Sequence, residues 1–579
     1  MAVAAGREPA TLLLAGGRLV NVFTNEVTPA DVLLAGRLVA GVYDPDDGQA
    51  QQRRERALEV IDLDGAYVVP GLIDGHVHLE SSLVSPAEYV RGVLARGVTG
   101  AVCDPHEVAN VAGEPGVRWL LASTDALPFD VWVTVPSCVP SSPFETVGAD
   151  FGPAAMERLL EHPRVVGVAE LMSFPAVVAG DPEVLAKARL GEARGLTVEG
   201  HAPGLSGAEL QAYLASGVGS DHESTTLEEG REKLRAGAFL MVREGSVTRD
   251  LDALLPLVHE GHAERVGFVT DDRLPHDLLS EGGVDLLVRR AVAAGVNPAY
   301  AVRCATLNVA RHYGLPRRGA VAAGYFADLA VVPDLEAFAP SLVLKEGAPV
   351  AEAGAVLPGS IPPATGGDAV VRGTVRLGEL DEAAFALADP GGAARCVVAL
   401  PNRILTSQTT VEPRVVAGRV VADPERDLLK LACVERYGRG GGVGLGLVTG
   451  FGLRRGALGS SVGHDHHNLM LVGADDADLL AAARRLEALG GGLVAVAGGR
   501  VLAELALPLA GLMTDLPLAE TRAALDALDA AARELGCTLP SPYMALSFLG
   551  LPVIPELRVT DLGLVDVLAG RLVPLAAEG

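Results

Sequence analysis

Aromatic residues and cysteines are scarce in this sequence. Phe, Trp and Tyr together make up 4% of the 579 residues, so the hydrophobic cores must consist mainly of Ala, Val and Leu. The six cysteines include no Cys-x-x-Cys pair, which argues against both a disulfide framework and a thiolate zinc site. Any metal ion would therefore be held by histidines and carboxylates.

Long apolar segments and basic residues are also in short supply. No window reaches the ~18 uninterrupted apolar residues that span a bilayer. The N-terminal segment lacks a signal-peptide pattern, so we expect a cytoplasmic protein. Lys and Arg number 47 against 73 Asp and Glu, which gives a net charge of −26. Because such an acidic surface repels phosphates, we expect neither a nucleic-acid nor a membrane partner.

The chain is long enough for about three to five structural units at ~100–200 residues each. Residues 1–65 and 316–362 contain short β-rich segments, which we interpret as two parts of one small β-sandwich domain split by an insertion. Residues 363–579 begin with strand-like segments and continue with helical ones, which predicts a separate C-terminal α/β domain. Within it, the Gly-rich residues 439–453 lack the ending of a phosphate loop, so tight turns between strands are favoured.

The middle of the chain, residues 66–315, alternates strand-like runs with helical stretches, a pattern typical of βα units. Eight candidate strands occupy residues 67–78, 97–105, 130–137, 165–171, 195–201, 217–223, 238–244 and 265–272. Eight strands in about 250 residues favour a (β/α)8 TIM-like barrel over a doubly wound sheet. The predicted fold class is therefore α/β, with a barrel as the central domain.

Histidines and acids gather at the C-terminal ends of these strands, where barrel enzymes place their chemistry. The set comprises His76, His78, Glu170, His201, His222 and Asp271. Since residues i and i+2 of a strand point to the same side, His76 and His78 can reach one ion. A lone histidine would more often be a core residue, but six donors on five strands predict two divalent metal ions bridged by Glu170.

Several motifs resemble known families. PGLIDGHVHLESS and GAVAAGYFADLAVV resemble the opening and closing segments of the amidohydrolase superfamily. HLESSLVSP, DPHEVANVAG, EGHAPGLSG, SDHES and TDDRLP together resemble the bacterial adenine deaminase family. SSVGHDHHNLM, GLMTDLP and LGLPVIPELRVTDLGLVDV resemble the C-terminal domain of that family, so the likeness runs nearly end to end.

The resemblance implies hydrolysis of adenine to hypoxanthine and ammonia, as in purine salvage. It also implies a small-molecule purine partner, a homodimer and a centre of two Mn²⁺ or Fe²⁺ ions, to which Zn²⁺ is chemically similar. The family bridges its metals with a glutamate where many superfamily members use a carboxylated lysine, and Glu170 occupies that place. The six donors named above take the family's ligand positions.

Two neighbouring acids are the candidate catalytic residues. Asp271 would take a proton from the metal-activated water and pass it toward the ring or the departing amine. Asp272 is a candidate for purine contact or proton transfer. Other polar residues that follow strands one, two and seven are Glu80, Ser82, His106, Glu107, Arg243 and Glu244. Each could contact purine nitrogens or orient a metal ligand.

A dense polar cluster stands out in the C-terminal domain: His464, Asp465, His466, His467 and Asn468. It could be an exposed turn, a loop that closes over the barrel mouth, or an extra metal site. The family resemblance favours a functional role without indicating which one.

Other function classes are weaker matches. An amidohydrolase that opens a cyclic amide, of the dihydropyrimidinase or dihydroorotase type, has a similar metal set. A dihydroorotase needs cations for the substrate carboxylate, whereas strand eight here supplies the acids of Thr-Asp-Asp. A barrel that had become an interaction protein would be expected to lack ligands, and all six are present. A cytidine-type zinc deaminase would need His-x-Glu with Pro-Cys-x-x-Cys, which is absent.

Overall fold

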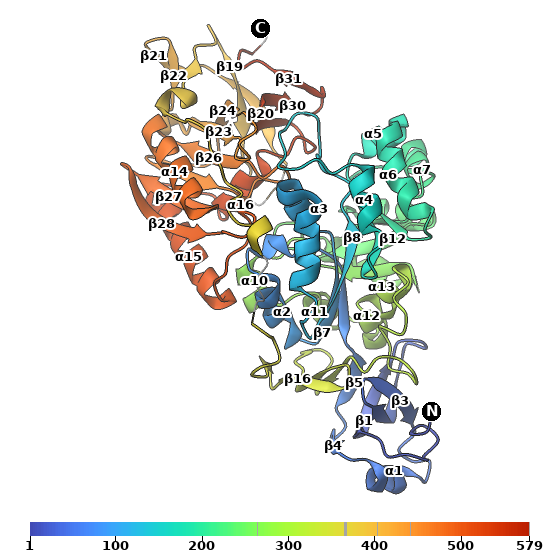
Figure 1. The fold of residues 1–579 in the computed structure, drawn as a ribbon. Helices are drawn as coiled ribbons and strands as arrows, with labels where there is room; N and C mark the ends of the chain where they lie inside the picture. The colour runs from blue at the N-terminus through green and yellow to red at the C-terminus, as the bar shows by residue number, and fades with distance from the viewer. Residues whose placement is uncertain (263, 364–367, 402, 404, 441, 578–579) are drawn as a thin grey trace.

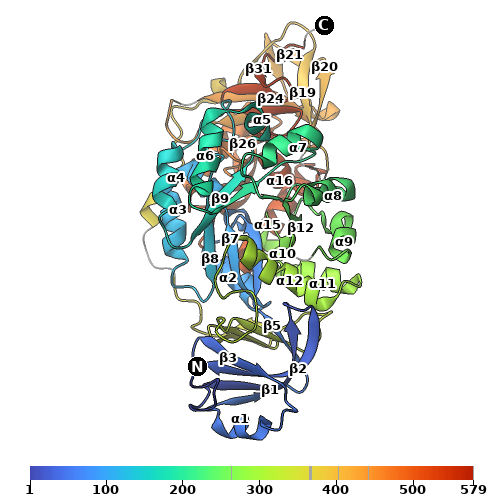
Figure 2. The same cartoon turned by 90° about the vertical axis from the view of Figure 1, so that its right-hand side faces the viewer.

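The structure is a computed structural model that describes residues 1–579 except 263, 364–367, 402, 404, 441 and 578–579. The barrel lies in the middle, with the N-terminal sheet at one end and the C-terminal domain against its other side (Figures 1 and 2). In the described part of the chain, no helix combines the length and apolar character needed to cross a membrane.

Eight parallel strands form the central barrel. They are β6 (Leu72–Val77), β7 (Val98–Cys103), β8 (Asp130–Val135), β9 (Val165–Leu171), β10 (Thr197–Gly200), β11 (Ser220–Asp221), β12 (Phe239–Arg243) and β13 (Val266–Val269). β6 to β10 pair in order, as do β11 to β13, and a parallel bridge between Val77 and Asp271 brings the last strand back to the first. The predicted α/β class and TIM-like barrel are confirmed. Strands β6, β7 and β9 are buried throughout because helices cover the outer face of the barrel.

The helices of this region are α2 (Pro86–Leu94), α3 (His106–Ser123), α4 (Pro153–Leu159), α5 (Phe174–Ala179), α6 (Pro182–Glu192), α7 (Gly207–Leu214), α8 (Leu227–Arg235), α9 (Leu251–His259), α10 (Pro275–Ser280), α11 (Asp285–Ala293), α12 (Pro298–Cys304) and α13 (Leu307–His312). A short 3₁₀ turn, η1, covers Glu80–Ser82. Proline stands in the first turn of six of these helices, where its fixed φ suits the helix and its missing N–H costs nothing.

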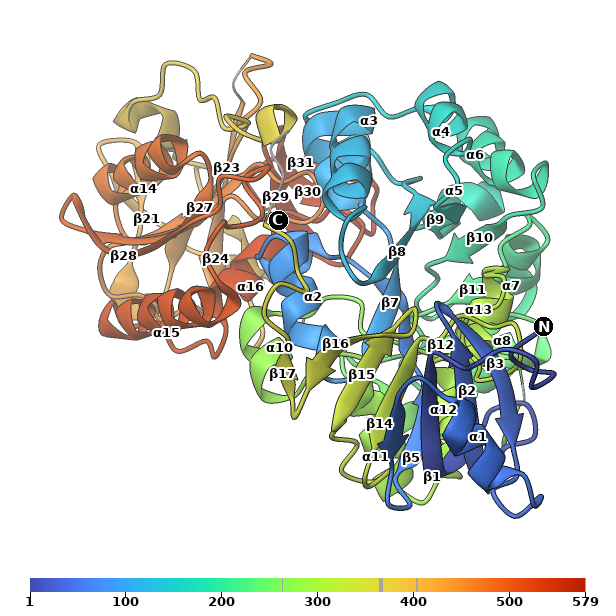
Figure 3. The same ribbon diagram turned by 60° about the horizontal axis from the view of Figure 1, so that its bottom comes forward.

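The segments on either side of the barrel build one sheet. Its nine strands are β1 (Leu12–Asn21), β2 (Glu26–Ala35), β3 (Leu38–Tyr43), β4 (Val60–Asp62), β5 (Tyr67–Pro70), β14 (Leu329–Val332), β15 (Leu342–Lys345), β16 (Ala348–Glu352) and β17 (Ala355–Val356), with helix α1 (Ala50–Arg56) beside them. β14 lies beside β5 (Figure 3) and pairs antiparallel with it, with Ala330 opposite Val69. Leu14 and Val32 share a core with Leu329 and Leu344, so side chains from both segments pack together.

The C-terminal domain is built on an eight-stranded sheet in the order β20-β19-β24-β23-β26-β25-β27-β28. Its strands are β19 (Ala394–Val398), β20 (Ser407–Val411), β23 (Leu429–Val434), β24 (Val443–Thr449), β25 (Ala457–Ser460), β26 (Leu469–Gly473), β27 (Gly492–Ala497) and β28 (Arg500–Ala506). Within the Gly-rich stretch, residues 443–449 form β24. Helix α14 (Asp476–Leu489) packs Leu479 and Leu486 on the sheet and ends at Gly490, whose left-handed φ of 74° stops the helix.

The remaining elements of this domain are two small sheets and two helices. One sheet holds β18 (Leu387–Ala388), β21 (Arg414–Val416) and β22 (Arg419–Val421), and the other holds β29 (Leu557–Thr560), β30 (Gly563–Asp566) and β31 (Arg571–Val573). The helices are α15 (Leu518–Glu534) and α16 (Pro542–Phe548), and 3₁₀ turns cover Asp368–Val370, Glu382–Phe385 and Pro424–Arg426.

Candidate metal centre and active site

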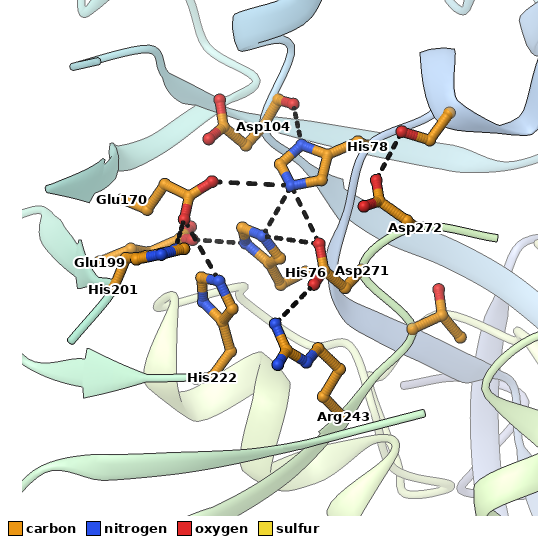
Figure 4. A network of polar contacts seen from close by, with 12 residues as sticks. His76, His78, Asp104, Glu170, Glu199, His201, His222, Arg243, Asp271 and Asp272 are labelled. Atoms are coloured by element: carbon orange, nitrogen blue, oxygen red, sulfur yellow. Dashed lines mark hydrogen bonds and ion pairs between the residues drawn. The ribbon is translucent and has the colours of Figure 1, made fainter. Parts of the chain in front are cut away.

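The strand ends bring two histidines of the first strand together. His76 is the penultimate residue of β6, and its Nδ1 lies 2.7 Å from Glu199 Oε2. His78 follows the strand and donates from Nδ1 to the backbone carbonyl of Asp104 at 2.9 Å. Both Nε2 atoms are thus left facing inward, 3.2 Å apart (Figure 4). Such outer contacts are what fixes the tautomer and ring orientation of metal-binding histidines.

Glu170 occupies the centre of the cluster. Its Oε2 lies 2.6 Å from His201 Nδ1 and 3.2 Å from His222 Nε2, while its Oε1 lies 3.6 Å from His78 Nε2 (Figure 4). Burial alone would raise the pKa of Glu170, but the charges of His201 and His222 hold it well below its ordinary value. One ionised carboxylate therefore faces histidines from both sides.

Asp271 closes the other side of the cluster. Its Oδ1 lies 3.1 Å from His78 Nε2, and its Oδ2 accepts a hydrogen bond from Arg243 Nη1 at 2.9 Å. Its φ of 59° and the hydrogen bond from its N–H to the carbonyl of His76 turn the carboxylate toward the histidines. Although burial opposes it, the hydrogen bond with His78 and the charge of Arg243 keep the pKa of Asp271 well below its ordinary value.

The donor atoms suit a divalent metal. Groups of ligand atoms that lie within 4.8 Å of one another are His76–His78–Asp271, His76–Glu170–His222, His201–His222–Glu223 and His78–Asp104–His106–Glu170. Imidazole and carboxylate donors in such sets fit Mn²⁺, Fe²⁺ or Zn²⁺. The six donors named from the sequence thus lie together at one mouth of the barrel, in groups that could hold a divalent metal ion.

The residues considered for purine contact have varied surroundings. Asp272 Oδ1 lies 2.5 Å from the Ser81 hydroxyl. Ser82 donates its hydroxyl to the carbonyl of Leu79 at 2.5 Å, within its own turn. Glu80 is buried beside Glu107, and burial together with that charge raises the pKa of Glu80 to about 8.

The arginine and glutamate that follow strand seven diverge. Arg243 pairs with Glu223, Asp250 and Asp271 at the barrel mouth. Glu244 instead pairs with Arg290 of α11, on the outer side. It contacts none of the metal-donor groups described above.

The polar cluster of the C-terminal domain is buried, so the interpretation as an exposed turn is wrong. His464 and Asp465 face the barrel. His466 has both nitrogens within hydrogen-bond distance of backbone groups, at Gly550 and Asn468, and burial lowers its pKa to about 4, which marks a core histidine. His467 Nδ1 accepts from the N–H of Gly463 within the same turn.

Three site residues escaped the sequence reasoning: Asp104, Glu199 and Glu223. Glu199 stands two residues before His201, on the same face of the strand, and that spacing was a usable signal. Glu223 is adjacent to His222, and its Oε1 lies 3.5 Å from His222 Nε2. Asp104 contributes both its backbone carbonyl, to His78 Nδ1, and its carboxylate, whose Oδ2 lies 3.0 Å from His106 Nδ1.

Comparison with known proteins agrees with this geometry. Residues 67–350 match the model described as the amidohydrolase family, which is the class that the barrel and its donor set define. Residues 403–571 match the adenine deaminase C-terminal domain. The chain belongs to the adenine deaminase family.

Curated relatives carry the same likeness over nearly the whole chain. It is 45% identical over 567 residues to the adenine deaminase of Desulfatibacillum aliphaticivorans, covering 98% of this chain and 97% of that protein. It is 46% identical over 574 residues to that of Nitratidesulfovibrio vulgaris, covering 98% and 96%. Among solved structures, the dihydropyrimidinase of Brevibacillus agri is similar over 60% of this chain and 96% of that chain, with 16% identity and a TM-score of 0.45.

Proposed function

We propose that this protein hydrolyses adenine to hypoxanthine and ammonia in purine salvage. The observation that carries the proposal is its similarity, over nearly its full length, to relatives named adenine deaminase. The six metal donors at the barrel mouth supply the chemistry that such a reaction needs. A homodimer and a cytoplasmic location belong to the same proposal.

Two divalent ions would share the donor set. We assign His76, His78 and Asp271 to one ion and His201 and His222 to the other. Glu170 would contribute to holding both ions, because its two oxygens face both groups of histidines. We propose Mn²⁺ or Fe²⁺ as the bound ions, and Zn²⁺ is the third candidate. Ions bound there would lower the pKa of a coordinated water toward neutrality.

The chain's own side chains would move the protons. We assign Asp271 the role of accepting a proton from the attacking water, because its carboxylate faces the histidine donors at the barrel mouth. Arg243, 2.9 Å from its Oδ2, orients that carboxylate. Asp272, whose Oδ1 accepts a hydrogen bond from the Ser81 hydroxyl, is the proposed purine contact. The reaction forms the C6–O bond, protonates N1 and the amine, and breaks the C6–N bond to release ammonia.

The charge at the barrel mouth disfavours a substrate carboxylate of the dihydroorotase type. The guanidinium of Arg243 is already paired with three carboxylates, of Glu223, Asp250 and Asp271. It is thus not free to bind an anionic substrate. A neutral purine, whose N–H groups donate to carboxylates, fits these surroundings.

The test is ammonia release from adenine by protein purified without oxygen and loaded with Mn²⁺ or Fe²⁺. We expect turnover that Asp271→Asn abolishes, whereas Asp252→Asn, the same change at an exposed position of α9, retains it. Protein that carries two ions per chain yet releases no ammonia would refute the adenine assignment and make cyclic amides the next substrates. Sedimentation velocity tests the homodimer, and a monomer would refute it.

A further inference from the structure

Two side chains of the C-terminal domain reach the barrel at the start of α3. Asp465 Oδ1 lies 3.5 Å from His106 Nε2, and His464 Nδ1 lies 3.6 Å from Glu107 Oε1. All four residues are buried, with exposed fractions between 1% and 4%. These contacts join the two domains through residues that are more than 300 positions apart in the chain.

Each contact continues to the proposed catalytic centre. His106 Nδ1 lies 3.0 Å from Asp104 Oδ2 and 3.5 Å from Oε1 of the bridging Glu170. The imidazole of His106 is therefore held between a carboxylate of the C-terminal domain and the carboxylates of the barrel. Its orientation toward Glu170 depends on both sides.

The second connection leads to Asp272. Glu107 Oε1 lies 2.7 Å from the Ser81 hydroxyl, and that hydroxyl lies 2.5 Å from Asp272 Oδ1. His464 contacts the same Glu107 oxygen. It therefore stands at the far end of a chain of polar contacts that ends at a candidate catalytic acid.

The segment that carries the pair is fixed in place. The backbone N–H of His464 donates to Ser547, and its ring stacks on Phe548 with centroids 4.5 Å apart. Asn468 donates to the carbonyl of Thr146 in the barrel at 2.8 Å. These contacts hold the segment against the barrel mouth, where its side chains can position those of the barrel.

We propose that Asp465 and His464 are positioning residues of the active site. Asp465 orients His106 against Glu170, and His464 orients Glu107 against Ser81. The C-terminal domain is then part of the catalytic machinery. This inference rests on the proposed function, because its main effect is read out as deamination.

The first test is Asp465→Asn in the full-length, metal-loaded protein. The substitution keeps the size of the side chain and removes its charge, so we expect kcat to fall about tenfold or more, in the range typical of residues that orient metal-centre groups. KM and the content of two ions per chain should stay unchanged, because no proposed ligand is altered. Asp526→Asn, the same change at an exposed position of α15, is the matched control and should alter none of these values.

The second test separates two roles of His464. His464→Asn keeps a nitrogen near the position of Nδ1 but removes the ring, whereas His464→Phe keeps the stack on Phe548 but removes the nitrogen. Positioning of Glu107 predicts that the asparagine variant retains more kcat than the phenylalanine variant. The reverse order would show a packing role and refute the proposal for His464. If Asp465→Asn fails to fold, the comparison of the two His464 variants still tests whether this C-terminal segment positions side chains of the barrel.

The outcomes distinguish this inference from the proposed function. Wild-type protein that holds two ions and shows no adenine turnover would refute the function itself. An active wild type with an equally active Asp465→Asn variant would refute only the positioning role. Loss of ions or a lower unfolding temperature in step with the loss of kcat would identify Asp465 as structural and would equally refute it.

Discussion

Lys233 offers a stringent test of how the barrel holds its second histidine pair. Its side chain is 1% exposed, and its Nζ donates to the carbonyl of Ala202 at 2.6 Å and to Asp221 Oδ2 at 2.9 Å. Ala202 follows His201, and Asp221 precedes His222. One buried ammonium group therefore ties together the two chain segments that carry these proposed ligands.

Lys233→Met would keep most of the side-chain volume and leave Asp221 buried without its cation. Removing one partner of a buried ion pair costs about 3–5 kcal/mol. Ser224 still donates to Asp221 Oδ2 at 2.8 Å, and the N–H of Ala202 donates to its Oδ1 at 3.0 Å. We therefore expect the lower end of that range, a loss of about 3 kcal/mol in the free energy of unfolding at neutral pH.

The loss should depend on pH with a definite sign. Burial acts to raise the pKa of Asp221, but Lys233 brings it below its ordinary value, so the wild type keeps this stabilisation until the pH falls through that lowered pKa. In Lys233→Met less of the effect of burial is offset, so the pKa of Asp221 rises and the folded state takes up a proton as the pH falls. The deficit of the variant should thus be smaller at pH 5 than at pH 7.

Urea unfolding at both pH values measures this, with tryptophan fluorescence as the probe, since Trp119 and Trp132 both lie in the barrel and are the chain's two tryptophans. Lys345→Met is the matched control, because Arg318 also pairs with both acids that Lys345 contacts, so a smaller loss is expected. Equal midpoints for wild type and Lys233→Met at pH 7 would refute the reasoning.

Three further predictions concern other parts of the chain. Glu199→Gln removes the charge behind His76 and should weaken metal binding about 10–100-fold, measured as ion content after dialysis against a graded chelator. Burial raises the pKa of Glu145 to about 8, so between pH 5 and 8 wild-type stability should fall, by up to about 1.4 kcal/mol per pH unit, relative to Glu145→Gln in denaturant titrations. Gly444→Ala would place a Cβ 1.7 Å from the carbonyl oxygen of Thr560 and should cost about 1–3 kcal/mol, seen as a lower unfolding temperature.

Each of these has a control and a result that would contradict it. Glu209→Gln, on an exposed site of α7, should leave ion content unchanged, and equal retention by both variants would contradict the role of Glu199. If the free energies of unfolding of wild type and Glu145→Gln changed in parallel with pH, the Glu145 carboxyl would not titrate as stated. Gly378→Ala meets open space, so an equal effect at Gly378 and Gly444 would exclude the steric cause.

The barrel and the central donor set could be predicted because their signals are local. A strand that ends in His-x-His, or in Glu-Gly-His, carries its periodicity and its chemistry within a few residues. The parallel order then places all the strand ends at one mouth. His76 and His201 were therefore found without any knowledge of packing.

The rest depends on contacts between distant segments. The sequence around His464 gives no sign that it packs on Phe548 and faces Glu107, so its burial could not be predicted. Ser82 is a polar residue after a strand end, as expected of a substrate contact, yet its hydroxyl donates to the carbonyl of Leu79 in its own turn. Glu244 follows its strand just as Arg243 does, but it turns outward to Arg290. Side-chain direction after a strand end is set by tertiary neighbours.

The pairing of β5 with β14 constrains how the chain folds during translation. β5 ends at Pro70 and β14 begins at Leu329, so the ribosome must make the whole barrel before this edge of the sheet finds its partner. Until then the edge of β5 exposes unpaired backbone groups, and pairings of such long range form slowly. The N-terminal sheet can therefore be completed only after the barrel has been synthesised, which couples the folding of the sheet to that of the barrel.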